Sequence, residues 1–442
     1  MTTPMKTSDG KLLRAVGAWG LAAGIVNVTI GGGIYRLPST VAESMGAAAP
    51  LAYLVCAGVM GLIALCIAEA GSRVSLTGGP YAYVEVAFGP FAGFIAGVMN
   101  WLIGATAIGA IGVVFIDNLG TMVPLFASPL GRTIGLIGGF TLLAAVNVAG
   151  VKHGARLSTG ITLVKVLPLL VLIAVGIFAI EPANLRVESV PETATITRTS
   201  IVLLFAFTGV ESALILGGEL KDPSRTVPRG ILIGMVGVAV VYLSVQFVAQ
   251  GILGPALAGA ATPLADAAAI AMGPWGRTLL LVAVIVSTFG YLSGMALASP
   301  RALYAFGRDG YLPRAMGAVH PTYKTPWVAV IVQLAICCTL ALTSGFAALA
   351  VISNVAALLV YLGCAGAAVQ LRRKGVQVPG TAPFRLPGGV LVPIIAGIAI
   401  LALLTSITWG EWLVLLEVAV AATVIFFVTR RHRAAMPRPT EG

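Results

Sequence analysis

The chain has 442 residues, of which 58% are apolar and only 10% are charged. An average soluble domain is about 25% charged, so this chain has too little polar surface to be covered by water. Although the formal net charge is +11, this composition excludes a soluble enzyme, a nucleic-acid-binding protein and a disordered scaffold. It predicts an integral membrane protein.

Long apolar runs recur along nearly the whole chain, and about 20 apolar residues cross a bilayer as a helix. We therefore expect an all-α membrane protein with twelve transmembrane helices. The runs lie near 15–37, 49–70, 91–116, 130–149, 157–179, 199–218, 230–252, 278–305, 327–343, 346–370, 391–408 and 411–430.

The basic residues divide unequally between the two sides of this arrangement. One side receives 21 of the 27 Lys and Arg residues, the other side receives five, and Lys165 lies inside a span. Because cytoplasmic loops carry the excess of Lys and Arg, we expect cytoplasmic tails at 1–14 and 431–442. The positive charge then faces anionic membrane lipid and not nucleic acid. The absence of a targeting segment and of long loops favours the inner (plasma) membrane of a prokaryote.

Two of the predicted spans contain residues that interrupt a helix. The first has Gly31, Gly32 and Gly33 near its middle, and the sixth has Gly209 close to Glu211. Each glycine costs ~1 kcal/mol of helix propensity, and unwound backbone in a membrane is tolerated only where it lines a cavity or is buried in protein. Interruptions in corresponding helices of two halves indicate a transporter with inverted repeats. Alternatively, the glycines let two helices pack closely.

Backbone groups freed at such a break suit a zwitterion. The N–H groups at the start of a half-helix bind a carboxylate, helped by the positive end of the helix dipole. The carbonyl groups at the end of the other half accept hydrogen bonds from an ammonium group. A site that offers both ends fits an amino acid.

Four ionisable residues lie inside predicted spans, namely Glu69, Lys165, Glu211 and Glu417. A charge at mid-helix costs ~2.5–3.5 kcal/mol, so each is a candidate functional group. Lys165 lies roughly two turns inside the boundary of its span, and it either reaches back to water or has a function. Glu69, near the end of its span, is interpreted as a solvated or structural acid.

No pattern for an enzyme, a metal site or a cofactor is present. The three histidines are scattered, and neither HExxH, a Walker A loop nor GxSxG occurs. The five cysteines fall in apolar runs, which indicates buried thiols and not a disulfide framework. We therefore expect neither catalysis nor a cofactor.

Several motifs, in order along the chain, resemble the amino acid–polyamine–organocation (APC) superfamily of transporters. The most specific is Phe205-Ala-Phe-Thr-Gly-Val-Glu211, followed by a charged loop at 218–229. The run Gly31-Gly-Gly-Ile-Tyr-Arg-Leu-Pro38 is similar to the family's first span. Further matches lie at 78–83, 88–90 and 301–313.

The resemblance implies a LeuT-like fold with two inverted five-helix repeats, at 15–179 and 199–370, and two peripheral helices at 391–430. Helices one and six would be discontinuous, and the protein would work by alternating access. The implied substrate-binding residues are Thr29, Ile30, Gly31, Gly32, Gly33, Phe205, Ala206, Phe207, Thr208, Gly209, Ile108 and Met295.

Within that set the resemblance also implies roles. The N–H groups of Gly32 and Gly33 would hold the substrate carboxylate, and carbonyl groups near Thr29, Phe205, Ala206 and Thr208 would hold the amine. Phe205 would close over the substrate, although an aromatic residue in a span more often packs against lipid. Where the arginine/agmatine antiporters of the family have Asn and Trp, Ile108 and Met295 stand here. Both are apolar, which favours a neutral substrate.

The resemblance further implies how transport is coupled to protons. Lys165 occupies the place of a sodium ion in sodium-coupled relatives, and its ammonium group would contact carbonyl groups of helix one and a hydroxyl of Ser287 or Thr288. Lys165 would release its proton as the site changes access, although some exchangers of the family share this lysine without such coupling. Glu211 would be a second proton site, an amine ligand or the partner of Lys165.

The sequence thus predicts a secondary transporter that takes up neutral amino acids together with protons. The alternatives are an amino acid exchanger and a transporter of cationic amino acids or polyamines that uses Glu211. An amino-acid-sensing receptor or a channel is an alternative of another class. The expected partners are an amino acid substrate, protons and membrane lipid.

Overall fold

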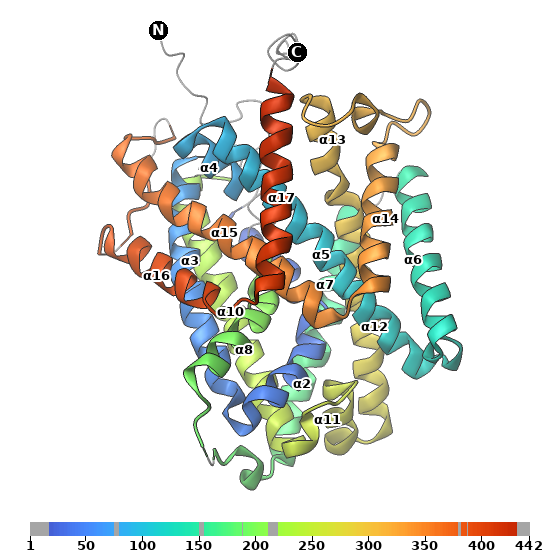
Figure 1. The fold of residues 1–442 in the computed structure, drawn as a ribbon. Coiled ribbons are helices and arrows are strands. Elements are labelled where there is room, and N and C mark those ends of the chain that lie inside the picture. Colours follow the sequence, from blue (N-terminus) through green and yellow to red (C-terminus); the bar gives the residue numbers. More distant parts are fainter. Residues whose placement is uncertain are drawn as a thin grey trace.

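The structure is a computed structural model. It describes residues 17–74, 79–149, 154–187, 189–210, 220–378, 382–386 and 388–430. For residues 154–164 and residue 223 it describes the backbone but not the side chains. Helices dominate these ranges (Figure 1). The first half contains α1 (Ala18–Thr29), α2 (Gly33–Met45), α3 (Ala49–Arg73), α4 (Pro80–Phe88), α5 (Pro90–Met122), α6 (Pro129–Ala149), α7 (Gly154–Gly176) and α8 (Thr193–Phe207). The second half contains α10 (Pro223–Leu253), α11 (Pro263–Met272), α12 (Pro274–Ala298), α13 (Pro300–Arg308), α14 (Trp327–Thr343), α15 (Phe346–Arg373), α16 (Leu391–Leu404) and α17 (Trp409–Val428).

The helices have the length and composition of a multi-pass membrane protein. Seven helical segments among the described residues are long and apolar enough to cross a bilayer, and six shorter apolar helices of 10–17 residues accompany them. Two of the shorter helices, α1 and α8, end where the sequence predicts an interruption, which explains their length. The expected number of twelve spans stays a prediction.

The bundle is arranged around α5, most of whose residues are buried. α15 packs along it, and both pass through the middle of the molecule in Figure 1. In contrast, α6 and α17 lie at the periphery and bury few residues, although both are strongly apolar. A helix that is apolar on its outward face is typical of contact with lipid.

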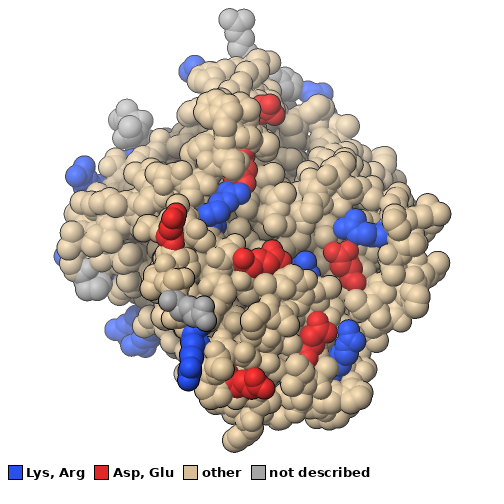
Figure 2. Space-filling view, turned by 60° about the horizontal axis from the view of Figure 1, so that its bottom comes forward, with Lys and Arg blue, Asp and Glu red and all other residues tan. Residues whose placement is uncertain are grey.

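Three ion pairs involve basic residues that the sequence places on the side with few Lys and Arg residues. Arg132 pairs with Asp117 at 2.9 Å, Arg198 with Glu411 at 2.7 Å and Arg277 with Asp266 at 3.5 Å. Figure 2, which brings the bottom of Figure 1 forward, shows acidic side chains interspersed with basic ones on that face. Three of the five basic residues expected on that side therefore have acidic partners, so this side carries little unbalanced positive charge.

Glu69 corrects part of an expectation from the sequence, because its side chain is fully buried. The carboxylate lies 2.9 Å from Arg73 Nη2, accepts two hydrogen bonds from the Arg372 guanidinium, and accepts a 3.2 Å hydrogen bond from the backbone N–H of Leu386. Glu69 is thus a structural acid that joins α3, α15 and the segment after α15. The interpretation as a solvated acid is wrong, since two arginines and a backbone donor replace water around it.

Candidate functional site

The first interruption lies between α1 and α2. α1 ends at Thr29 and α2 begins at Gly33, so 30–32 form no α-helix. The chain turns at Ile30, whose ψ is 76°, and the Gly31 N–H donates a 2.8 Å hydrogen bond to the Thr29 carbonyl. The last carbonyl groups of α1 and the first N–H groups of α2 therefore lack their usual intrahelical partners.

The second interruption lies at the end of α8. Phe207 is the last residue of this helix, and Thr208 has an extended backbone with ψ of 151°. Gly209 has φ of +124°, a conformation that favours glycine because it has no Cβ. Glu211 and the remainder of the predicted sixth span, up to 218, lie outside the described residues.

The two interruptions are in direct contact. A Cβ atom placed on Gly209 would lie 3.1 Å from Val28 Cγ1 and 3.3 Å from the Thr29 backbone nitrogen. Gly209 therefore allows the backbone of α8 to approach the end of α1. Segments 180 residues apart in the sequence form one centre as a result.

Two side chains bind the freed carbonyl groups of α1. The Lys165 ammonium, on α7, donates a hydrogen bond to the Asn27 carbonyl oxygen, and the Tyr242 hydroxyl, on α10, donates a 2.8 Å hydrogen bond to the Thr29 carbonyl oxygen. Lys165 is buried. The Tyr35 hydroxyl, on α2, donates a 3.0 Å hydrogen bond to the Lys165 carbonyl oxygen. Lys165 thus connects both halves of the interrupted helix to α7.

The start of α2 is closely surrounded by apolar atoms. A Cβ on Gly32 would lie 2.5 Å from the Thr288 methyl carbon and 2.9 Å from Ile111 Cδ1. A Cβ on Gly33 would lie 3.0 Å from the Phe205 ring. The Phe205 ring also meets the Phe346 ring edge to face at 5.5 Å. The backbone at these two glycines is therefore lined by an aromatic ring and methyl groups and has no room for side chains of its own.

The two candidate hydroxyls on α12 differ in their bonding. The Thr288 hydroxyl donates to the Val284 carbonyl at 2.6 Å and the Ile285 carbonyl at 3.1 Å, which directs its methyl group at Gly32. The Ser287 side chain is a neighbour of the Tyr35 hydroxyl, but its oxygen has no hydrogen bond of standard geometry within the described part of the chain. Unlike the Thr288 hydroxyl, the Ser287 hydroxyl is therefore not bound to carbonyl groups of its own helix.

Besides Tyr242, two further residues at the first interruption have no signal in the sequence, namely Ile111 and Tyr291. Ile111 contacts Gly32, and a Cβ on Gly31 would lie 3.6 Å from the Tyr291 ring. The predicted residues on the same helices stand about one turn away, because Ile108 precedes Ile111 by three positions and Met295 follows Tyr291 by four. A helix that is apolar on most of its faces gives no signal of its rotation, so the sequence does not distinguish residues one turn apart.

A bundle of apolar helices with two interrupted helices in contact at its centre defines a multi-pass membrane protein whose unwound backbone is enclosed by protein. The profile of the amino acid permease family matches residues 16–431. The chain belongs to this family, and therefore to the APC superfamily of transporters.

Similarity to individual proteins covers much of the chain. The serine/threonine exchanger SteT of Bacillus subtilis is 31% identical over 77% of this chain and 79% of its own length. The branched-chain amino acid permease BcaP of Bacillus subtilis is 26% identical over 96% of this chain and 95% of its own. The arginine/agmatine antiporter of Chlamydia felis is 27% identical over 86% and 83%. These relatives are transporters and not enzymes.

Proposed function

We propose that this protein carries neutral amino acids across the cell membrane by alternating access between two inverted five-helix repeats. The observation that carries the proposal is the contact between Gly209 and the Val28–Thr29 backbone, because it brings two interrupted helices together. N–H groups at Gly32 and Gly33 bind the substrate carboxylate. Carbonyl groups at the ends of α1 and α8 bind its ammonium group.

The preference for a neutral side chain follows from the surroundings of the first interruption. The groups that face Gly31, Gly32 and Gly33 come from Tyr291, Thr288, Ile111 and Phe205, and all are uncharged. A cationic substrate side chain placed among these four residues would lose its water without gaining a charged partner from any of them, which is costly. The names of SteT and BcaP, a serine/threonine exchanger and a branched-chain permease, agree with this class.

Proton coupling is assigned to Lys165. While it is protonated, its ammonium group holds the Asn27 carbonyl and so fixes the end of α1 against α7. A neutral amine is a weaker donor than an ammonium group. Release of the proton therefore loosens this end of α1. The Ser287 side chain lies beside the Tyr35 hydroxyl, which bonds the Lys165 carbonyl, so it belongs to the same site. Glu211 is retained in the proposal as a second proton site.

Exchange of one amino acid for another is the second candidate. It is favoured by the 31% identity with a serine/threonine exchanger. In an exchanger the same two interruptions bind the substrate, but the binding site does not reorient from one side of the membrane to the other while it is empty. Both candidates place the protein in the inner membrane with its two tails in the cytoplasm, in agreement with the paired arginines at the opposite end.

Transport by the purified protein in liposomes tests the proposal. We first identify ligands by thermal shift across the twenty amino acids and common polyamines, since a ligand at 100 times its Kd adds about 2.7 kcal/mol of stability. Uptake of the labelled ligand is then measured with an inward proton gradient, with and without a proton ionophore. Accumulation that the ionophore abolishes supports symport. Uptake that requires internal amino acid and ignores the ionophore supports exchange, and stabilisation by polyamines alone contradicts both.

A further inference from the structure

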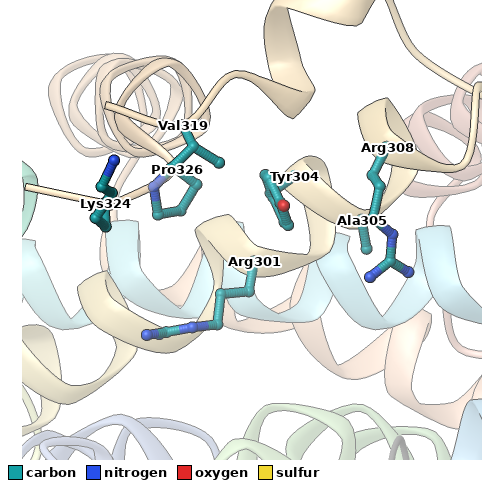
Figure 3. Close-up of a pocket in the computed structure, with 7 residues that line it drawn as sticks. All are labelled: Arg301, Tyr304, Ala305, Arg308, Val319, Lys324 and Pro326. Carbon is teal, nitrogen blue, oxygen red and sulfur yellow. The ribbon is translucent and has the colours of Figure 1, made fainter. Parts of the chain in front are cut away.

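A cavity of about 400 Å³ opens between α13 and segment 319–326, away from the two interruptions. In Figure 3 the Tyr304 ring lies across the hollow from Val319 and Pro326, with Lys324 and the Arg301 guanidinium towards one end and Arg308 at the other. Its lining residues are Arg301, Tyr304, Ala305, Arg308, Val319, Lys324 and Pro326. It therefore combines basic groups with an apolar wall.

Backbone contacts hold both walls of the cavity. The α13 wall is one helix face, since Arg301, Tyr304 and Arg308 follow at spacings of three and four. A Cβ on Gly307 would lie 2.5 Å from the Gly317 nitrogen, so these glycines let the chain after α13 pack directly on the helix.

The opposite wall is tied down at its far end. The His320 N–H donates to the Thr325 carbonyl at 2.8 Å, and the Thr325 hydroxyl donates to the Val148 carbonyl of α6 at 2.6 Å. Segment 319–326 is thus anchored to a neighbouring helix. The cavity is preformed, which lowers the entropic cost of binding.

The charges at the cavity are unbalanced. Arg308 pairs with Asp309 at 2.7 Å, whereas neither Arg301 nor Lys324 has a carboxylate within ion-pair distance among the described residues. Lys324 has φ of +57°, which is uncommon for a residue other than glycine, and a 3.0 Å hydrogen bond from its N–H to the His320 carbonyl holds this conformation. Two cations without an acid at one end of a cavity favour an anion.

Neighbouring aromatic residues place the cavity at the level of lipid headgroups. Tyr323 and Trp327 are 51% and 38% exposed, and Trp327 is the first residue of the apolar helix α14. Exposed Tyr and Trp residues at the ends of apolar helices mark the boundary between membrane and water. Basic pockets at this boundary suit the headgroups of anionic lipids.

We propose that this cavity binds the phosphate group of an anionic phospholipid. Arg301 and Lys324 bind the phosphate oxygens, and Tyr304, Val319 and Pro326 contact the glycerol and the first acyl carbons. A soluble phosphate ester shares the anionic chemistry, but the exposed Tyr323 and Trp327 beside the cavity and its apolar wall favour the lipid. The proposal requires only that the protein lies in a membrane and is independent of its substrate.

The full-length protein in neutral detergent tests this site through its thermal stability and through lipid retention in native mass spectrometry. The added probes are phosphatidylglycerol, phosphatidylcholine with the same acyl chains, and glycerol 3-phosphate. The test variant is Arg301→Gln with Lys324→Gln. The matched control is Arg229→Gln with Arg373→Gln, which also removes two positive charges from exposed side chains, but away from the cavity. If the double variant does not fold, the single variants replace it, because both side chains are exposed.

We expect phosphatidylglycerol to raise Tm and to be retained more than phosphatidylcholine by the wild type and the control variant. In the test variant the advantage of phosphatidylglycerol should disappear. Equal effects of the two lipids on the wild type would overturn the proposal, as would an advantage that survives in the test variant or is lost equally in the control. A glycerol 3-phosphate effect equal to that of phosphatidylglycerol would show that the site binds a soluble anion, which also overturns the assignment to lipid.

Discussion

The Tyr242 hydroxyl donates a 2.8 Å hydrogen bond to the carbonyl oxygen of Thr29, the last residue of α1. The two residues lie on helices from different halves of the chain. Because Tyr242 is fully buried, water does not reach this carbonyl from the side of α10. The bond therefore stabilises the interrupted end of α1 at the candidate substrate site.

Tyr242→Phe removes this donor without changing the packing of the ring. Loss of one hydrogen bond costs about 1 kcal/mol, so we expect a lower Tm in detergent and weaker ligand binding. Tyr53→Phe is the matched control, since Tyr53 is equally buried but its hydroxyl has no hydrogen-bond partner within the described residues. Equal losses in the two variants would show that the bond to Thr29 has no special role.

Alanine substitutions at Gly31 and Gly32 distinguish the two adjacent glycines. A Cβ on Gly32 would lie 2.5 Å from the Thr288 methyl carbon, whose position is fixed by the hydroxyl bonds of the same side chain. A Cβ on Gly31 would meet the Tyr291 ring at an ordinary 3.6 Å. We expect Gly32→Ala to lose ligand-induced stabilisation and uptake, and Gly31→Ala to retain most of both. The reverse order would contradict the assigned packing.

Lys165→Ala tests the role of the buried ammonium group. Without it the Asn27 carbonyl loses the hydrogen bond from the ammonium group, and position 165 can no longer carry a proton. We expect proton-driven accumulation of amino acid to be abolished, with binding of the ligand retained. Lys374→Ala is the control, because the Lys374 ammonium also donates to a backbone carbonyl, that of Ala87, but lies at the end of α15. Accumulation that survives Lys165→Ala would refute the proton role.

Glu69→Gln should destabilise the protein far more than a similar change at a surface ion pair. It leaves Arg73 and Arg372 without their shared carboxylate in a buried place, and removing one partner of a buried pair costs about 3–5 kcal/mol. Asp117→Asn breaks the exposed pair with Arg132, which is worth about 0–1 kcal/mol. Denaturation in detergent measures both. Similar small losses would mean that the Glu69 cluster contributes little to stability.

The sequence alone determined the class of protein and the position of both interruptions. Apolar length and glycine content act locally, so the ends of α1 at Thr29 and of α8 at Phe207 could be expected from neighbouring residues. The motifs at 31–38 and 205–211 likewise pointed to the family that the profile match establishes. The short helices α4 and α11 were not predicted, because runs of nine and ten residues are too short to appear as spans.

Only the tertiary structure decided which side chains meet the interruptions. Tyr242 and Ile111 carry no sequence signal that distinguishes them from other residues of buried apolar helices, yet they contact Thr29 and Gly32. Contacts between distant helices depend on how each helix is rotated and shifted along its axis, and one residue turns a helix by about 100°. Local propensity does not contain that rotation. It is set by how all the helices pack together, as the burial of Glu69 between two arginines also shows.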